Sequence, residues 1–334
     1  MESQLFWVGT VVALKKWELL WHALRGRTRT AIFSVTTRCN CKCAMCGIPK
    51  MDKVTIPLRR AKEVIDDCSR NGVLFMSFTG GEPLMHPDIG EILSYANAKG
   101  MFIHVASNGT MPERIKMLSG VVDLIGFSLD SHIPEEHNRN RGRRSCSDEV
   151  AKSVRISHML GMKSFVNTPP NQMIKDCIED YVSFVNEEMD CPVGFCYPMV
   201  DNGGYYDKGS NVVSILKPSE IVRFYAKAIE LKRNHSKITN TDGFLRESIS
   251  YTLGHKVSPC RAGKCVVWID WEGAVHPCFN KGTTRLDNGN HRLWSDLDTS
   301  KCNECFNQCF REPSIVDGDI ANMIRDWRLY KYLI

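Results

Sequence analysis

Three cysteines near the N-terminus have a spacing that suits an iron–sulfur cluster. Cys39, Cys43 and Cys46 form the pattern C-x3-C-x2-C within the run TTRCNCKCAMCGIP. A [4Fe–4S] cluster is normally held by four cysteines, so three thiolates leave one iron open to a ligand. Cys41 does not fit this spacing and is interpreted as a non-ligand, although the run CNCKC also permits a shifted register. A structural zinc site is the alternative, and it needs a fourth Cys or His nearby.

Six further cysteines near the C-terminus are also typical of a metal site. They are Cys260, Cys265, Cys278, Cys302, Cys305 and Cys309. A hairpin pattern with a cysteine at each end, together with a distant C-x2-C pair, brings four thiolates together. Such a set suits an iron–sulfur cluster or zinc.

The composition limits where the protein works and what it binds. The chain has 334 residues, fifteen cysteines and a formal net charge of +5. Close cysteine spacings favour metal ligation over disulfides, and free thiolates need a reducing compartment, so we expect a cytoplasmic protein. The small charge excess does not indicate a nucleic-acid partner in the absence of a localised basic stripe.

Small and polar residues follow two of the predicted strands. The run Gly80-Gly81-Glu82-Pro83 follows the second strand. Glycine lets the backbone approach a ligand closely, and Glu82 can accept hydrogen bonds from an ammonium group. Ser107 and Asn108 follow the third strand. Their side chains can bond ribose hydroxyls, or they can serve as turn residues.

The same pattern continues after the fourth predicted strand. Ser128 and Asp130 lie at its end, in the run GFSLDS. Arg141 follows, and its guanidinium can make a forked contact with a carboxylate. A solvated basic loop is the alternative for Arg141, because Arg143 and Arg144 come directly after it.

The elements that must position these residues alternate between strands and helices. Predicted strands are Ala31–Thr36, Leu74–Phe78, Met101–Val105, Val122–Leu129, Lys163–Asn167 and Val193–Tyr197. Helical patterns between them include Leu58–Asn71, Pro87–Lys99, Asp148–Leu160 and Gln172–Glu188. This alternation predicts an α/β fold with parallel strands and right-handed crossovers, here a partial, TIM-like (βα)6 barrel. Ligands then bind at the carboxyl ends of the strands.

Taken together, the motifs over about residues 31–200 resemble the radical S-adenosylmethionine (SAM) superfamily. The resemblance implies that Cys39, Cys43 and Cys46 hold a [4Fe–4S] cluster whose open iron binds SAM. It also implies that Gly80–Pro83 receives the SAM amino group and that the polar strand ends line the ribose and methionine. His137–Gly142 resembles the family stretch H-D-x-x-R-G, with Asn138 in place of the usual Asp.

The C-terminal cysteines resemble the SPASM/twitch extensions of that superfamily. The run from Cys265 through Gly273 to Cys278 has their characteristic spacing. No cysteine follows Cys309, so the resemblance implies one auxiliary [4Fe–4S] cluster rather than two. Two ligand sets stay open: Cys260, Cys278, Cys302 and Cys305, or Cys260, Cys265, Cys278 and Cys309.

We expect five segments along the chain. These are an amphipathic helix at 1–29, a radical SAM barrel at 30–200, a helical linker at 201–254, an auxiliary-cluster domain at 255–312 and a C-terminal helix at 313–334. Residues 4–29 are rich in tryptophan and end in basic residues. They are typical either of a helix at a membrane interface or of one packed on the main domain.

The resemblance implies an enzyme that makes a radical on its substrate, with an electron donor such as flavodoxin or ferredoxin. The N-terminal segment favours a lipid-related or membrane-associated substrate, and a small molecule is also compatible. The first alternative is a maturase that modifies a ribosomal peptide. The second is a non-catalytic iron–sulfur or zinc redox sensor, which explains the cysteines but not the run Gly80–Pro83.

Overall fold

The computed structural model describes residues 21, 29–198, 216–234, 236–281, 302–317 and 326. Its centre is an eight-stranded sheet in the order β6-β5-β4-β3-β2-β1-β7-β8. The strands are β1 Thr30–Thr36, β2 Phe75–Gly80, β3 Phe102–Ser107, β4 Leu124–Ser128, β5 Lys163–Thr168, β6 Val193–Phe195, β7 Val266–Ile269 and β8 Val275–His276. The strands from β6 to β7 are parallel, which confirms the predicted α/β barrel-like fold.

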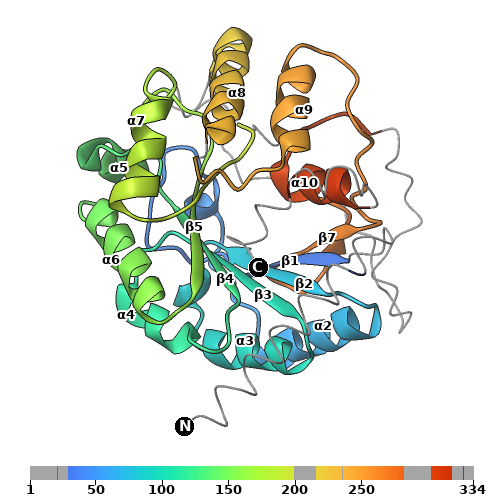
Figure 1. Ribbon diagram of the computed structural model, residues 1–334. Coiled ribbons are helices and arrows are strands. Elements are labelled where there is room, and N and C mark those ends of the chain that lie inside the picture. The colour runs from blue at the N-terminus through green and yellow to red at the C-terminus, as the bar shows by residue number, and fades with distance from the viewer. Residues whose placement is uncertain are drawn as a thin grey trace.

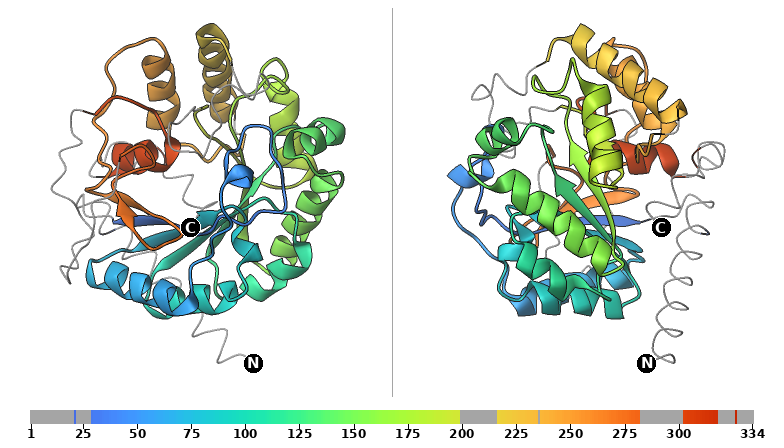
Figure 2. Two further views of the ribbon diagram at one scale, coloured as in Figure 1. Left: turned by 180° about the vertical axis from the view of Figure 1, so that it is seen from behind. Right: turned by 60° about the vertical axis from the view of Figure 1, so that its left-hand side comes forward.

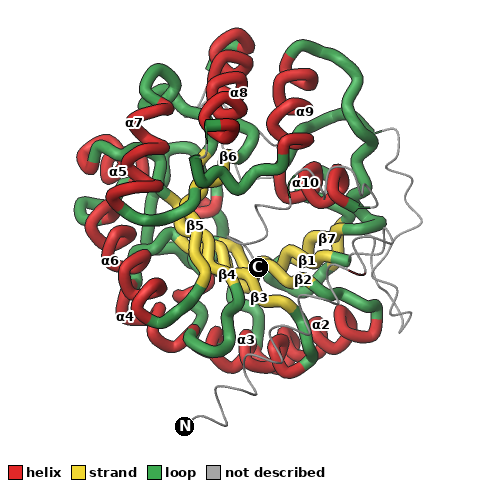
Figure 3. Tube along the Cα trace, viewed as in Figure 1, coloured by secondary structure: helices red, strands yellow, loops and turns green. Residues whose placement is uncertain are grey.

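Helices surround this sheet on its outer side (Figures 1 and 3). They are α2 Leu58–Arg70, α3 Ile89–Ala98, α4 Pro112–Ile115, α5 Pro134–Arg141, α6 Cys146–Met159, α7 Ile178–Ser183, α8 Pro218–Arg233, α9 Asp242–Thr252 and α10 Gln308–Val316. The alternate strand residues Phe78, Val105 and Phe127 are fully buried in the core, as are Ile65 and Leu93 on the helices. This burial of apolar surface fixes which side of each strand faces the helices.

The C-terminal hairpin joins the main sheet. The hairpin lies in the segment predicted as an auxiliary-cluster extension at 255–312, where β7 pairs in parallel with β1 and Thr30 donates its N–H to the carbonyl of Cys265 at 2.8 Å. The indole of Trp268 also donates to Ser34 Oγ at 3.0 Å. The auxiliary cysteines around the hairpin are thus attached to the strand that precedes the first cysteine motif.

One predicted helix starts later than expected. The pattern at 172–188 predicted a helix from Gln172, whereas α7 begins at Ile178 and continues as a π-helical turn over Phe184–Glu188. The side chain of Asn171 accounts for the delay. It accepts from the N–H of Met173 at 2.9 Å and donates to the carbonyl of Asp130 at 3.0 Å, which stabilises a turn in place of a helix.

The N-terminal prediction is largely untested by the structure. Of residues 4–29, only Trp21 and Arg29 are described. In the described part of the chain, no helix has the length and apolar character needed to span a bilayer. The predicted C-terminal helix at 313–334 is described only at residues 313–317, which include the last residues of α10, and at Asp326.

Candidate active site

The predicted cluster cysteines lie on the loop that follows β1, which crosses the strand ends when the molecule is seen from behind (Figure 2). Thr37 at its start donates its N–H to the carbonyl of Val54 at 2.9 Å. Cys39, Cys43 and Cys46 are all partly buried there. The structure therefore places the three thiols at the carboxyl end of the first strand, where parallel α/β folds bind their ligands.

Two glycines allow the next loop to touch the cysteine loop. The N–H of Gly81 bonds the carbonyl of Thr36 at 2.7 Å, and the N–H of Glu82 bonds that of Arg38 at 2.8 Å. A Cβ at Gly80 would lie 2.3 Å from the oxygen of Thr36, and a Cβ at Gly81 would lie 2.3 Å from that of Arg38. These glycines are therefore required for close contact between two backbones. Pro83 opens the short helix that follows.

Glu82 ties the loop after β2 to the loop after β3. Its carboxylate is fully buried and accepts from the N–H of Leu84 at 3.0 Å, Ser107 Oγ at 3.0 Å and the N–H of Asn108 at 2.7 Å. Burial raises the pKa of Glu82 to about 7, although these donors oppose the shift. A carboxylate offers about four acceptor sites, so little capacity is left for the ammonium group that we expected it to bind.

Asn108 contacts the cysteine loop. Its Nδ2 lies 2.9 Å from Asn40 Oδ1, 3.4 Å from Cys41 Sγ and 3.7 Å from Cys39 Sγ. Its Oδ1 accepts from the N–H of Thr110 at 3.0 Å. The structure thus gives Asn108 and Ser107 a role in holding the loops together. Their expected contacts with SAM stay predictions.

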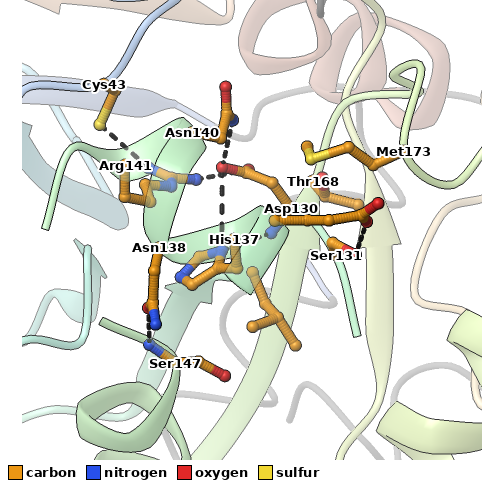
Figure 4. Close-up of polar contacts among 12 residues, drawn as sticks. Cys43, Asp130, Ser131, His137, Asn138, Asn140, Arg141, Ser147, Thr168 and Met173 are labelled. Carbon is orange, nitrogen blue, oxygen red and sulfur yellow. Dashed lines mark hydrogen bonds and ion pairs between the residues drawn. The ribbon is translucent and has the colours of Figure 1, made fainter. Parts of the chain in front are cut away.

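A buried ion pair joins the fourth strand to the cysteine loop (Figure 4). Arg141 Nη2 lies 2.6 Å from Asp130 Oδ1, and Asn140 Nδ2 lies 2.7 Å from Asp130 Oδ2. Arg141 Nη1 also donates to Cys43 Sγ at 3.7 Å. Burial alone would raise the pKa of Asp130, but the Arg141 guanidinium, with His137 and Asn140, holds that pKa below its usual value.

This arrangement rules out the solvated loop that was the alternative for Arg141. Residues 134–141 form α5, and Arg141 is buried at its end. The cysteine loop bonds the exposed carbonyls of that helix end: Lys42 donates to Arg141 and Ala44 to Asn140, at 3.0 and 2.8 Å. Position 142 requires glycine. Its φ is +62°, and a Cβ there would lie only 2.6 Å from the carbonyl oxygen of Lys42.

The remaining predicted residues here have simpler surroundings. Ser128 ends β4 opposite Asn167 and is partly exposed, as a ligand contact requires. Asn138, which stands where the family has Asp, accepts from the N–H of Ser147 at 2.9 Å and so supports the first turn of α6 (Figure 4). An amide oxygen can replace a carboxylate in that contact.

The donor set of this loop fits an iron–sulfur cluster. A hydrogen bond from Cys41, opposed by burial and helped by Arg141, lowers the pKa of Cys43 to about 6, whereas burial raises that of Cys46 to about 12. In the described residues, Asn140 Oδ1 and Arg141 Nε are buried without a hydrogen-bond partner. Three thiols beside unpartnered polar atoms suit an anionic cluster together with a polar ligand. No three Cys, His, Asp or Glu side chains of the described residues converge enough to hold a single metal ion.

Four of the six C-terminal cysteines influence one another's pKa electrostatically. The Cys260 thiol interacts electrostatically with Cys302, the Cys278 thiol with Cys305 and Cys260, and the Cys305 thiol with Cys260 and Cys302. Burial raises the pKa of Cys278 to about 11. These interactions support the first predicted ligand set, which stays a prediction.

The other two C-terminal cysteines differ in their surroundings, and Cys265 packs in the same apolar cluster as Cys260 and Cys278. Cys309 on α10 is exposed, and its electrostatic neighbours are Glu312 on its own helix and Cys196 beyond β6. Cys265 is buried, and Asp317 is its strongest charged neighbour, ahead of Cys260.

Sequence reasoning missed the arginine that organises this second site. Arg311 is almost fully buried on α10. It donates to the carbonyl of Ser258 at 2.6 Å, to that of Cys305 at 3.0 Å and to Asn303 Oδ1 at 2.8 Å. It thereby joins the segments that carry Cys260 and Cys305. No spacing in the sequence marks it, because its partners are mostly backbone oxygens.

Comparison with known proteins agrees with the geometry. The family model of the Radical SAM superfamily matches residues 33–181 of this chain. The antilisterial bacteriocin subtilosin biosynthesis protein AlbA of Bacillus subtilis is 34% identical over 255 residues, which are 74% of this chain and 54% of AlbA. Fe-coproporphyrin III synthase of Methanosarcina barkeri is 26% identical over 302 residues, which are 80% of this chain and 73% of that protein. The chain therefore spans only about half the length of AlbA.

Solved structures share the fold at low sequence identity. SuiB of Streptococcus suis bound to its precursor peptide SuiA has a TM-score of 0.64 at 15% identity, with 93% of this chain and 76% of SuiB covered. anSMEcpe with bound AdoMet and the Cp18Cys peptide has a TM-score of 0.61 at 19% identity, with 91% and 96% covered.

Proposed function

Since the chain belongs to the radical SAM superfamily, we propose that it is an enzyme that cleaves SAM reductively and abstracts hydrogen from a substrate. The observation that carries the proposal is the loop of Cys39, Cys43 and Cys46, which the Arg141–Asp130 pair and Asn108 contact at one edge of a parallel sheet. When bound, the [4Fe–4S] cluster and SAM supply a 5′-deoxyadenosyl radical.

The surrounding residues position the thiols and keep charge balanced. Arg141 offsets the negative charge of the thiolates, and Asp130 keeps its guanidinium in place. Glu82 fixes the separation of the second and third strand ends. Because these groups are buried, their electrostatic effects are stronger than they would be in water. A water-excluded pocket also protects a reactive carbon radical from side reactions.

The test is anaerobic reconstitution followed by addition of SAM and dithionite. We expect 5′-deoxyadenosine from the wild type and none from Cys39→Ser, Cys43→Ser or Cys46→Ser. Cys68→Ser is the matched control, because Cys68 is a buried thiol on α2. A fully loaded wild type that forms no 5′-deoxyadenosine would instead support the redox sensor.

We propose a peptide as the substrate. AlbA, mycofactocin maturase MftC and PqqA peptide cyclase all match the chain, and the first and last of these names refer to a peptide product or substrate. A tetrapyrrole is the second candidate, because Fe-coproporphyrin III synthase aligns over 80% of this chain. The lipid hypothesis rests on residues 4–29 and stays a prediction.

Isotope transfer separates these substrates. Perdeuterated peptide, porphyrin and lipid fractions are each incubated with the loaded enzyme and SAM. Hydrogen abstraction transfers one deuterium to 5′-deoxyadenosine, which raises its mass by one unit. We expect this increase with the peptide fraction. An increase with the porphyrin or lipid fraction alone would overturn the peptide proposal.

We further propose that Cys260, Cys278, Cys302 and Cys305 hold one auxiliary [4Fe–4S] cluster. The electrostatic interactions among these thiols support this set over the one containing Cys309. We expect Cys305→Ser to lose about half of the bound iron and Cys309→Ser to lose none. The reverse result would favour the alternative set.

We propose a reducing cytoplasm as the cellular setting, because the close spacings among the fifteen cysteines suit metal ligation and thiolate ligands need reducing conditions. An electron donor such as flavodoxin or ferredoxin is proposed for the reductive step. Reduction of the loaded protein by either one in place of dithionite tests that partner.

A further inference from the structure

Two stretches of the chain around the cysteine loop carry positive charge without any negative charge. Residues 38–51 and 137–147 together hold seven arginine and lysine residues and no aspartate or glutamate. The first stretch contains the three predicted cluster cysteines, and the second runs from α5 into the start of α6. The formal net charge of the whole chain is only +5, so positive charge is concentrated in these two stretches.

The fold places the two basic stretches side by side. The N–H of Lys42 donates to the carbonyl of Arg141 at 3.0 Å, and that of Ala44 donates to the carbonyl of Asn140 at 2.8 Å. A Cβ at Gly142 would lie 3.1 Å from the Cβ of Lys42. The side chain of Lys42 therefore begins directly beside the link between α5 and α6, where the second stretch has its arginines.

These cations differ in how far the protein itself neutralises them. Arg141 is buried against Asp130, and Arg143 is only partly exposed and bonds both oxygens of Glu149 at 2.6 Å.

Three other cations of these stretches face solvent. Lys42, Arg139 and Arg144 are exposed, and no ion pair found in the described part of the chain includes any of them. Exposed charges of one sign that no neighbour neutralises create a field that attracts an oppositely charged partner. We call these three side chains the basic surface.

The basic surface lies where a redox partner would have to bind. Lys42 stands next to Cys43 in the cysteine loop, and the thiols of Cys39 and Cys43 are themselves partly exposed. Complexes between electron-transfer proteins are weak and have small interfaces, so they depend on complementary charge for fast association. A positive surface beside the predicted cluster ligands therefore fits a donor protein with a negative surface.

We propose that Lys42, Arg139 and Arg144 form the docking surface for a one-electron donor protein whose redox group is surrounded by acidic side chains. This inference rests on the proposed function, because it assumes that the cysteine loop holds the cluster that is reduced. One electron leaves the redox group of the donor and is accepted by the oxidised cluster, and no atom is transferred. Charge steering of this kind raises association rates by about 10–10³-fold and weakens as salt screens it.

The test mixes the loaded protein with flavodoxin hydroquinone in a stopped-flow spectrometer and follows the flavin semiquinone that forms when one electron leaves. Arg139→Glu/Arg144→Glu is the test variant. Arg155→Glu/Arg246→Glu is the matched control, because these arginines are exposed on α6 and α9 and change the net charge equally. At low salt we expect the second-order rate constant of the test variant to fall by about tenfold and that of the control to change much less. The difference should shrink at about 1 M salt, where the Debye length is ~3 Å.

Reduced methyl viologen separates docking from damage to the cluster. It is a small cation, so its rate of electron transfer to the test variant should stay the same or rise. A parallel fall in the rates with both donors, or a loss of iron from the test variant, would locate the effect in the cluster itself and overturn the proposal. Lys42→Glu is a second test variant, and we expect it to slow flavodoxin in the same selective way.

Failure of the docking surface differs from failure of the proposed function. If the wild type accepts no electron from methyl viologen, the proposed function fails, and the Kd of oxidised flavodoxin for the wild type and the test variant still tests the surface. If methyl viologen reduces every variant and flavodoxin reduces the test variant as fast as the control, the surface is wrong. Unchanged flavodoxin rates together with weaker binding of an oligoglutamate peptide would assign the surface to an acidic peptide and would also overturn the proposal.

Discussion

At the scale of single residues, the buried carboxyl groups of Asp130 and Glu82 have different functions beside the cysteine loop. Asp130 is an ion-pair partner whose pKa lies below its usual value, and Glu82 is a buried carboxyl whose pKa is raised to about 7. Both were expected to touch SAM. In the structure each bonds protein groups that position the loops around the cysteines.

Asp130→Asn is expected to destabilise the protein by about 3–5 kcal/mol, because it leaves the buried Arg141 guanidinium without its counter-ion. Urea unfolding of the cluster-free protein measures this. Glu113→Gln removes two exposed ion pairs and should change the free energy of unfolding far less, because solvent screens exposed charges. Equal losses in the two variants would contradict the assigned role of Asp130.

The raised pKa of Glu82 predicts that the stability of the protein depends on pH. Its folded pKa of about 7 lies above its unfolded value, so the native state binds more protons between about pH 4.5 and 7. The free energy of unfolding therefore falls as pH rises through this window, by up to about 3 kcal/mol. In Glu82→Gln this contribution is absent. The difference in unfolding free energy between this variant and the wild type should therefore change between about pH 4.5 and 7. A difference independent of pH would contradict the raised pKa.

At the scale of elements, the end of α5 determines the position of the cysteine loop. The carbonyls of Asn140 and Arg141 accept from the backbone of that loop, and Gly142 permits this contact. A side chain at position 142 would therefore move the loop as well as strain the local backbone.

Gly142→Ala and Gly161→Ala are a matched pair that tests this. Both glycines have positive φ, +62° and +68°, so each alanine should cost about 1–2 kcal/mol of backbone strain. A Cβ at 161 has nothing within 4 Å, whereas one at 142 would meet Lys42 at 2.6 Å. We expect Gly142→Ala alone to lose iron from the first site. Equal iron content in the two variants would show that the contact is not needed.

The auxiliary site depends in the same way on α10. Arg311→Ala removes the donor shared by the segments carrying Cys260 and Cys305, so we expect it to lose about half of the iron and the auxiliary signal. Exposed Arg246 on α9 provides the control, because Arg246→Ala changes only surface charge. Full iron content in Arg311→Ala would show that Arg311 is not needed for binding of the auxiliary cluster.

At the scale of the whole molecule, local patterns predicted the strands well, because buried parallel strands are apolar runs bounded by turns. They did not predict that β7 pairs with β1, since that pairing joins residues far apart in the sequence. Spacing likewise predicted Cys39, Cys43 and Cys46 as cluster ligands. It could not show that Asn108 contacts Cys41 Sγ, or that Glu82 bonds Asn108, because such contacts exist only once the chain is folded.

The central claim is that three cysteines hold a cluster whose remaining iron binds SAM. Electron paramagnetic resonance of the dithionite-reduced Cys305→Ser protein, with and without SAM carrying ¹⁵N in its amino group, tests it directly. The account predicts that SAM changes the cluster signal and that the ¹⁵N nucleus couples to it in pulsed measurements. A reduced cluster with the same signal in the presence and absence of SAM would contradict the account.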